Sequence, residues 1–89
     1  PKLISITGEV FKITKSITSI GRGTEADIQI DDTSVSRLHC EILLGTEVLI
    51  RDLGSTNGTS VDGVRANESV VRDGSIIKIG NITLTYQSR

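Results

Sequence analysis

Hydrophobic and polar residues alternate along most of this chain with a period of two, not with the period of about 3.6 residues that marks a helix. Short β-branched runs carry the alternation: residues 3–14, 16–20, 26–31, 39–53, 59–65 and 74–87. No long window offers a helical apolar stripe with capping residues. The pattern predicts an all-β fold of many short strands, arranged as a sandwich or a barrel.

Turn signals separate these runs. Asn-Gly and Asp-Gly pairs tolerate positive φ and close hairpins. Pairs of this kind occupy residues 57–58, 62–63 and 73–74, and the pairs Gly-Thr at 45–46 and Gly-Asn at 80–81 are further turn signals. The chain has no linker, low-complexity tract or internal repeat, which predicts a single domain over residues 1–89. Because small binding modules usually work attached to other domains, we expect this domain to be cut from a longer protein.

The composition limits both the core and the partners. The chain has no Met or Trp, and Phe11 and Tyr86 are its only large rings, so Ile, Leu and Val must build the core. A formal net charge of −1 provides no basic field for nucleic acid or an anionic membrane. No apolar run approaches the roughly 20 residues that span a bilayer, and no signal peptide is visible. Cys40 is the single cysteine, which excludes an intrachain disulfide and favours the reducing cytoplasm.

Gly21, Gly23 and Ala26 have the Gly-x-Gly-x-x-Ala spacing of a dinucleotide-binding fingerprint. That fingerprint works only where a helix begins at its third position and points its N-terminus at the pyrophosphate. Here Ala26 leads into residues 27–31 (DIQID), which have a strand pattern. A nucleotide site is therefore rejected, and Arg22 lies in a loop between two strands.

Three polar segments connect the predicted strands: residues 21–27, 31–39 and 52–63. Their guanidiniums, hydroxyls and amide suit a phosphate held by charge-assisted hydrogen bonds. The donors are Arg22, Arg37, Ser34, Ser36, Ser55, Thr56 and Asn57. Successive loops alternate between the ends of a sandwich, but a hairpin or a very short strand can return them to one end. Loops gathered in this way are a common binding platform.

The segments GR at 21–22, SRLH at 36–39 and STNGT at 55–59, in this order and spacing, resemble a forkhead-associated (FHA) domain. The resemblance covers nearly the whole chain. It implies a β-sandwich of two mainly antiparallel sheets with about eleven short strands. It also implies that loops at one end bind phosphothreonine peptides in extended form, without a cofactor.

The resemblance also assigns roles by position. The implied phosphate contacts are Arg22, Ser36, Arg37 and Thr56, and Asn57 is implied to hold the peptide main chain. Three positions shape the loops: Gly21, His39 and Gly58. Positions that contact residues flanking the phosphothreonine vary within the family, and here they are Ser34, Val35 and residues 60–62.

An enzyme is the least favoured class. His39, Ser36 and Asp52 could be read as a catalytic triad, but the sequence gathers no nucleophile–base pair and no oxyanion hole. One Cys and one His cannot form a zinc site. We predict a non-enzymatic cytoplasmic module that binds a phosphothreonine-containing partner: a Ser/Thr kinase, a kinase substrate or a segment of its own parent chain. The alternative is a phosphate-independent interaction domain that uses a sheet face.

Overall fold

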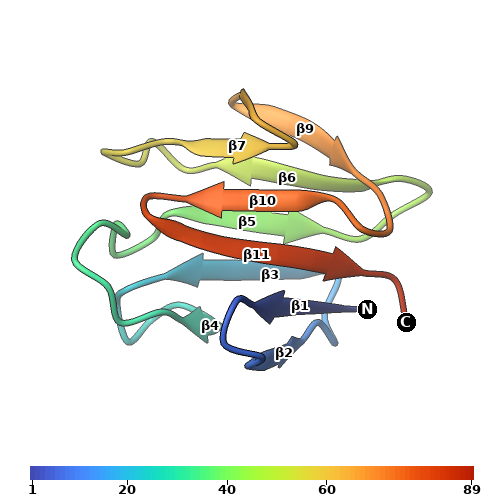
Figure 1. The fold of residues 1–89 in the computed structure, drawn as a ribbon, viewed down its shortest axis with the longest axis horizontal. Helices are drawn as coiled ribbons and strands as arrows, with labels where there is room; N and C mark the ends of the chain where they lie inside the picture. Colours follow the sequence, from blue (N-terminus) through green and yellow to red (C-terminus); the bar gives the residue numbers. More distant parts are fainter.

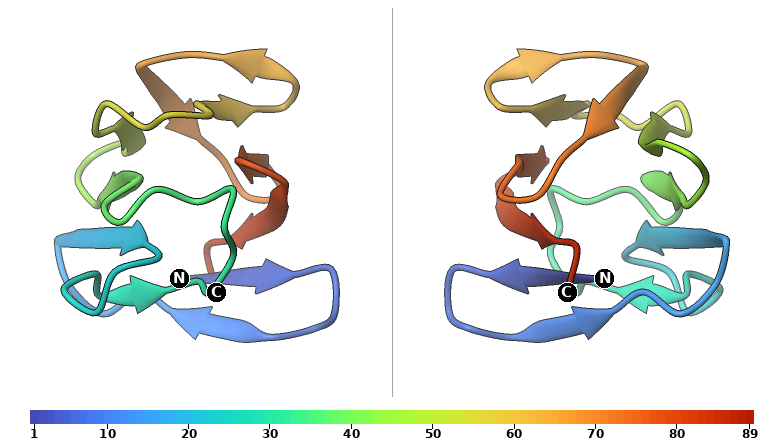
Figure 2. Two further views of the ribbon diagram at one scale, coloured as in Figure 1. Left: turned by 90° about the vertical axis from the view of Figure 1, so that its left-hand side faces the viewer. Right: turned by 90° about the vertical axis from the view of Figure 1, so that its right-hand side faces the viewer.

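The structure is a computed structural model that describes residues 1–89, and it contains eleven strands and no helix. The strands form two sheets that face each other, as both end-on views in Figure 2 show. One sheet has the order β2-β1-β11-β10-β7-β8, and the other has the order β4-β3-β5-β6-β9. The predicted all-β sandwich of two mainly antiparallel sheets is confirmed.

Both sheets are built from short strands (Figure 1). The six-stranded sheet contains β1 (Lys2–Ser5), β2 (Val10–Lys12), β7 (Thr59–Val61), β8 (Val64–Arg65), β10 (Ile76–Ile79) and β11 (Ile82–Gln87). The five-stranded sheet contains β3 (Ile17–Gly21), β4 (Ile28–Gln29), β5 (Cys40–Leu43), β6 (Val48–Asp52) and β9 (Glu68–Val71).

The core follows from the alternation in the sequence. In β10, Ile77 and Ile79 are fully buried, whereas Ile76 and Lys78 face outward. Fourteen buried residues form one cluster between the sheets, and nearly all of them are Ile, Leu or Val. Tyr86 belongs to this cluster, and the half-buried Phe11 packs against it.

Strand β9 was not among the predicted runs. The strand has only four residues, too few for a clear alternation of hydrophobic and polar positions. It begins with a charged residue, Glu68, and another, Arg72, follows directly after its end. It forms because it pairs in antiparallel register with β6, and because Val71 is buried. The predicted turn at residues 62–63 does close a hairpin between β7 and β8, and its two residues have positive φ angles of 50° and 83°.

One parallel pair of strands positions the loops. Ile20 pairs with Ile28 and Gly21 with Gln29, so β4 runs in the same direction as β3. Strand β4 is only two residues long and pairs with the last two residues of β3, so the segment between the two strands turns back by only that length. The segment after β4 therefore begins at the end of the sandwich where β3 ends. Strand β6 also ends there, because β5 is antiparallel to both β3 and β6. The loops that follow β3, β4 and β6 are thus gathered at one end, on the left in Figure 1.

Candidate functional site

The loop after β3 and the loop after β4 are joined by backbone hydrogen bonds. The Arg22 amide donates to Ser36 O over 2.9 Å, and the Gly23 amide donates to Arg37 O over 3.0 Å. The half-buried Arg22 side chain donates from Nε to Val35 O over 3.0 Å. Arginine has five N–H donors, so this bond orients the guanidinium and leaves its other donors available. No carboxylate forms an ion pair with Arg22.

Gly21 is required by the close approach of these two loops. A Cβ at position 21 would lie 2.7 Å from the carbonyl carbon of Arg37. Because that atom belongs to the backbone, it could move only by disturbing the hydrogen bond between Gly23 and Arg37. A side chain at position 21 is therefore incompatible with the observed path of the loop after β4.

His39 joins the loop after β4 to the loop after β6. Its ring is fully buried. Its Nδ1 accepts a hydrogen bond from the Ser36 amide over 3.1 Å, so its Nε2 carries the proton and donates to Gly58 O over 2.8 Å. Neither ring nitrogen bonds the Ser36 hydroxyl or Asp52, and the arrangement is therefore not a triad. The imidazole fixes the backbone of two loops.

Ser36 and Thr56 lie beside Arg22. Ser36 Oγ accepts a hydrogen bond from the Thr56 amide over 3.1 Å, which leaves the Ser36 O–H free to donate to a ligand. The Asn57 side chain donates from Nδ2 to Ser34 O over 2.8 Å. That bond orients the amide and leaves its carbonyl oxygen and its second N–H unused.

Arg37 is engaged differently from Arg22. Its Nη2 lies 2.9 Å from Glu25 Oε2, in an exposed ion pair. The pKa of Glu25 lies below its ordinary value because its own backbone amide and the Arg37 guanidinium donate hydrogen bonds to it. Exposed pairs contribute about 0–1 kcal/mol, so Arg37 can exchange Glu25 for another anion at little cost.

These side chains surround one open depression of about 330 Å³. Eight residues form its wall: Arg22, Thr33, Ser34, Val35, Ser36, Arg37, Thr56 and Asn57. The structure therefore brings together all four predicted phosphate contacts, the predicted main-chain contact and two of the predicted flanking positions, Ser34 and Val35. The other predicted flanking positions, residues 60–62, do not line this depression. Thr33 is an addition that the sequence did not indicate.

Val35 differs from its predicted role. Its side chain is only 1% exposed and belongs to the core cluster. It can contribute only main-chain atoms to the depression, and one of these, its carbonyl oxygen, accepts from Arg22. A side chain turned into the core cannot select a flanking residue of a ligand. Ser34 stays at the rim, where its hydroxyl accepts from the Asn81 amide and bonds Asp32.

Asp52 and Ser55 shape the loop after β6, a role that the sequence analysis missed. Asp52 accepts from the Gly54 amide and from both the amide and the hydroxyl of Ser55, and also from Thr59 Oγ1. Burial alone would raise the pKa of Asp52, but the hydrogen bonds from Ser55 and Thr59 outweigh burial and lower it. Ser55 Oγ accepts in turn from the Gly58 amide over 2.9 Å. An Asp followed by Ser three residues later is a local turn signal that could have indicated this.

The fold and the site define a β-sandwich with a depression lined by hydrogen-bond donors among its loops. Residues 18–80 match the FHA domain family. The chain belongs to this family, whose members are binding modules. The structure contains no helix that could span a lipid bilayer.

Three similar proteins place the chain within the family. It is 38% identical over 80 residues to the glycogen accumulation regulator GarA of Mycobacterium tuberculosis, and the match covers 89% of the chain and 49% of GarA. The chain thus spans about half the length of this curated relative. An FHA domain from a structural and functional analysis of phosphothreonine-dependent FHA domain interactions has a TM-score of 0.93 and 33% identity, covering 99% of this chain and 95% of that one. The FhaA FHA domain, solved in complex with the intracellular domain of Rv3910, has a TM-score of 0.88 and 34% identity over 94% of this chain and 96% of that one.

Proposed function

We propose that this chain is a phosphothreonine-dependent peptide-binding module. The observation that carries the proposal is the convergence of Arg22, Ser36 and Thr56 on one open depression. Each of the three has a side-chain donor that no protein group uses. Phosphate presents up to two negative charges and three acceptor oxygens, so this donor set matches it in charge and in number.

Each side chain has a distinct role in the proposed complex. The Arg22 guanidinium pairs with the phosphate, because its Nε bond to Val35 O already fixes its direction. Ser36 and Thr56 donate their hydroxyls to the other phosphate oxygens. Arg37 adds a second guanidinium when it leaves Glu25. Asn57 binds the peptide main chain with the part of its amide that Ser34 does not use.

The hydrogen bonds among these loops prepare the site before a ligand arrives. His39 fixes Ser36 relative to Gly58, and Asp52 fixes the turn that carries Thr56 and Asn57. Because the loops are already ordered, less conformational entropy is lost on binding, and affinity rises accordingly.

We propose that the chain is a binding module without enzymatic activity. His39 is committed to two backbone groups. Burial, together with the negative charge of Asp52, raises the pKa of the Cys40 thiol to about 12, so Cys40 is not a nucleophile at neutral pH. The depression contains donors for an anion but no paired base.

The proposed partner is a phosphothreonine-containing protein in the cytoplasm: a Ser/Thr kinase, a kinase substrate or a segment of the parent chain. The FhaA FHA domain was solved with the intracellular domain of another protein, which supports a protein partner and an intracellular location. The match to about half of GarA supports the proposal that this domain is part of a longer protein.

Isothermal titration with a phosphothreonine peptide library and its unphosphorylated copy tests the function. We expect binding of phosphorylated peptides only. Arg22→Ala should lose at least tenfold in affinity, because a hydrogen bond to a charged group contributes about 1.5–3 kcal/mol. Arg72→Ala is the matched control, since Arg72 follows β9 at the opposite end of the sandwich, and it should bind like wild type. Equal binding of both libraries would favour the phosphate-independent sheet-face interaction instead.

A further inference from the structure

Three side chains form a polar row across the outer face of the six-stranded sheet. Lys78 of β10 lies opposite Ser60 of β7, and Ser60 lies opposite Arg65 of β8. Residues opposite each other share a face, and the neighbours of Ser60 in β7 are buried, so all three side chains point away from the core. With adjacent strands about 4.8 Å apart, the Cα atoms of Arg65 and Lys78 are separated by about 10 Å.

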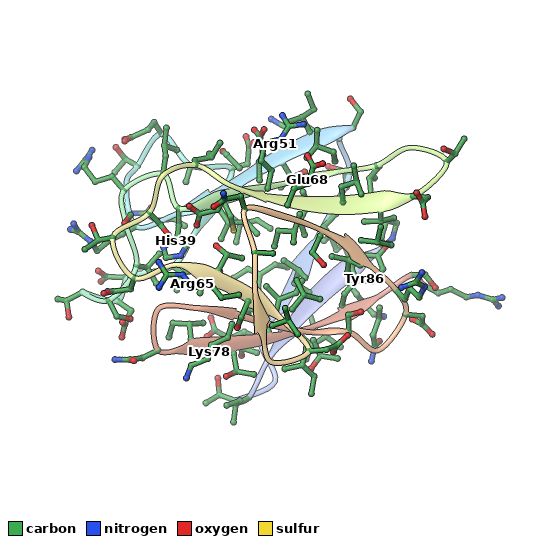
Figure 3. The ribbon with its side chains drawn as sticks, turned by 90° about the horizontal axis from the view of Figure 1, so that it is seen from above. His39, Arg51, Arg65, Glu68, Lys78 and Tyr86 are labelled. Atoms are coloured by element: carbon green, nitrogen blue, oxygen red, sulfur yellow. The ribbon has the colours of Figure 1, made fainter.

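The two cations of this row have no acidic partner. Arg65 and Lys78 are both exposed. Neither takes part in any of the ion pairs of the structure, which involve Lys15, Arg37 and Arg51. Figure 3 shows both side chains toward the end of the molecule where His39 lies. Their charges are therefore available at the binding end of the sandwich.

Arg65 also reaches toward the loop that carries Asn57. A Cβ at Gly58 would lie 2.6 Å from Cζ of the Arg65 guanidinium, so this side chain lies directly over Gly58. Gly58 has a positive φ of 84°, a backbone conformation that favours glycine. Any other residue here would also place its side chain against the Arg65 guanidinium. The position of Arg65 is thus tied to the turn that follows Thr56.

A depression of about 210 Å³ lies at this row, and none of its lining residues is hydrophobic. Asn57 lines both this depression and the proposed phosphate site, so the two adjoin. We propose that Arg65, Lys78 and Ser60 form a second anion subsite, which binds a carboxylate or a second phosphate on the same peptide. The inference rests on the proposed function, because the phosphothreonine must anchor the peptide.

The geometry sets the spacing of the two anions. Thr56, a proposed phosphate contact, and Ser60 are four positions apart, which corresponds to at most about 13 Å along an extended chain. An extended peptide covers that distance with about four residues, and the long Arg65 and Lys78 side chains add reach. The second anion is therefore about three to five residues from the phosphothreonine.

A charge scan of the ligand tests this subsite. The peptides share one phosphothreonine in a neutral sequence and carry a single Glu at each of six positions on either side, with Gln at the same positions as controls. Further peptides carry a second phosphate at each position three to five residues from the phosphothreonine. Each is titrated against wild type, Arg65→Gln, Lys78→Gln and the matched control Arg72→Gln.

We expect Glu to raise wild-type affinity about two- to fivefold at one or two positions, three to five residues from the phosphothreonine. The gain should fall as salt rises. It should be lost in Arg65→Gln and Lys78→Gln but kept in Arg72→Gln, while all four proteins bind the neutral peptide equally. A gain with Glu identifies a carboxylate as sufficient, and a gain with the second phosphate alone identifies a phosphate-specific subsite.

Two results would overturn the subsite while leaving the proposed function intact. One is a wild-type protein that still binds the neutral phosphopeptide but gains no affinity from either Glu or the second phosphate at any position. The other is an equal loss of affinity for neutral and acidic peptides in Arg65→Gln and Lys78→Gln, which would assign these side chains to the shape of the loop. Failure of wild type to bind any phosphopeptide would remove both proposals together.

Discussion

Replacing His39 by Ala tests how the site is held together. The change leaves the Ser36 amide and the Gly58 carbonyl without their imidazole partner. A buried polar group left unsatisfied costs about 1–3 kcal/mol. Gly58 O keeps a weak hydrogen bond from the Gly80 amide at 3.4 Å, so the combined loss should be about 2–4 kcal/mol. For a domain of this size that corresponds to a fall in Tm of about 10–30 °C.

Thermal and urea unfolding followed by circular dichroism would measure this loss, and titration with a phosphothreonine peptide would measure affinity. Leu38→Ala is the matched control, because the neighbouring Leu38 side chain is 42% exposed and its loss should change stability by less than about 1 kcal/mol. We expect His39→Ala to lose stability and to bind more weakly. Unchanged stability with abolished binding would make His39 a direct ligand and refute the reasoning.

Four further predictions concern the backbone, the ligand, and the pH dependence of binding and of stability. Gly21→Ala should destabilise the domain by about 1–3 kcal/mol, measured by urea unfolding, because its Cβ would meet the Arg37 backbone. Gly45→Ala, whose Cβ would lie 3.5 Å from its nearest neighbour, should be tolerated. In competition titrations, phosphoserine should bind several-fold more weakly than phosphothreonine, because it lacks the methyl group, whose burial contributes about 0.8 kcal/mol. Affinity should fall below about pH 6 as the phosphate gains a proton. Hydrogen bonds from Lys15 and then Ser19 hold the pKa of Asp27 at about 2, below its ordinary 3.8. Its stabilisation is thus present above pH 3.8 and lost as pH falls through 2, so urea midpoints should show a weaker acid dependence in Asp27→Asn.

Much of the fold could be predicted because the alternation directly encodes burial. In β10, two isoleucines that face the core flank a lysine that faces water. Strand β9 could not be predicted in this way, because an edge strand of four residues has too short a pattern. Its formation depends on β6, which lies about twenty positions earlier in the chain and offers free backbone groups for pairing.

The site could be predicted only as a set of residue types in loops. Local signals indicated the turn at Asn57 and Gly58, but not which partners hold them. The bond from Asn57 to Ser34 joins residues 23 positions apart, and the ion pair of Arg37 with Glu25 joins residues 12 positions apart. Such contacts depend on how the loops meet in space. For the same reason, the sequence did not reveal that Val35 turns into the core.

Amide chemical-shift mapping by NMR tests the central claim most directly. One sample receives a phosphothreonine peptide, and a second receives the same peptide without the phosphate. The account predicts that only the phosphorylated peptide shifts resonances, and that the shifts cluster at Arg22, Ser36, Arg37, Thr56 and Asn57. Shifts confined to a sheet face, or equal shifts with the unphosphorylated peptide, would contradict it.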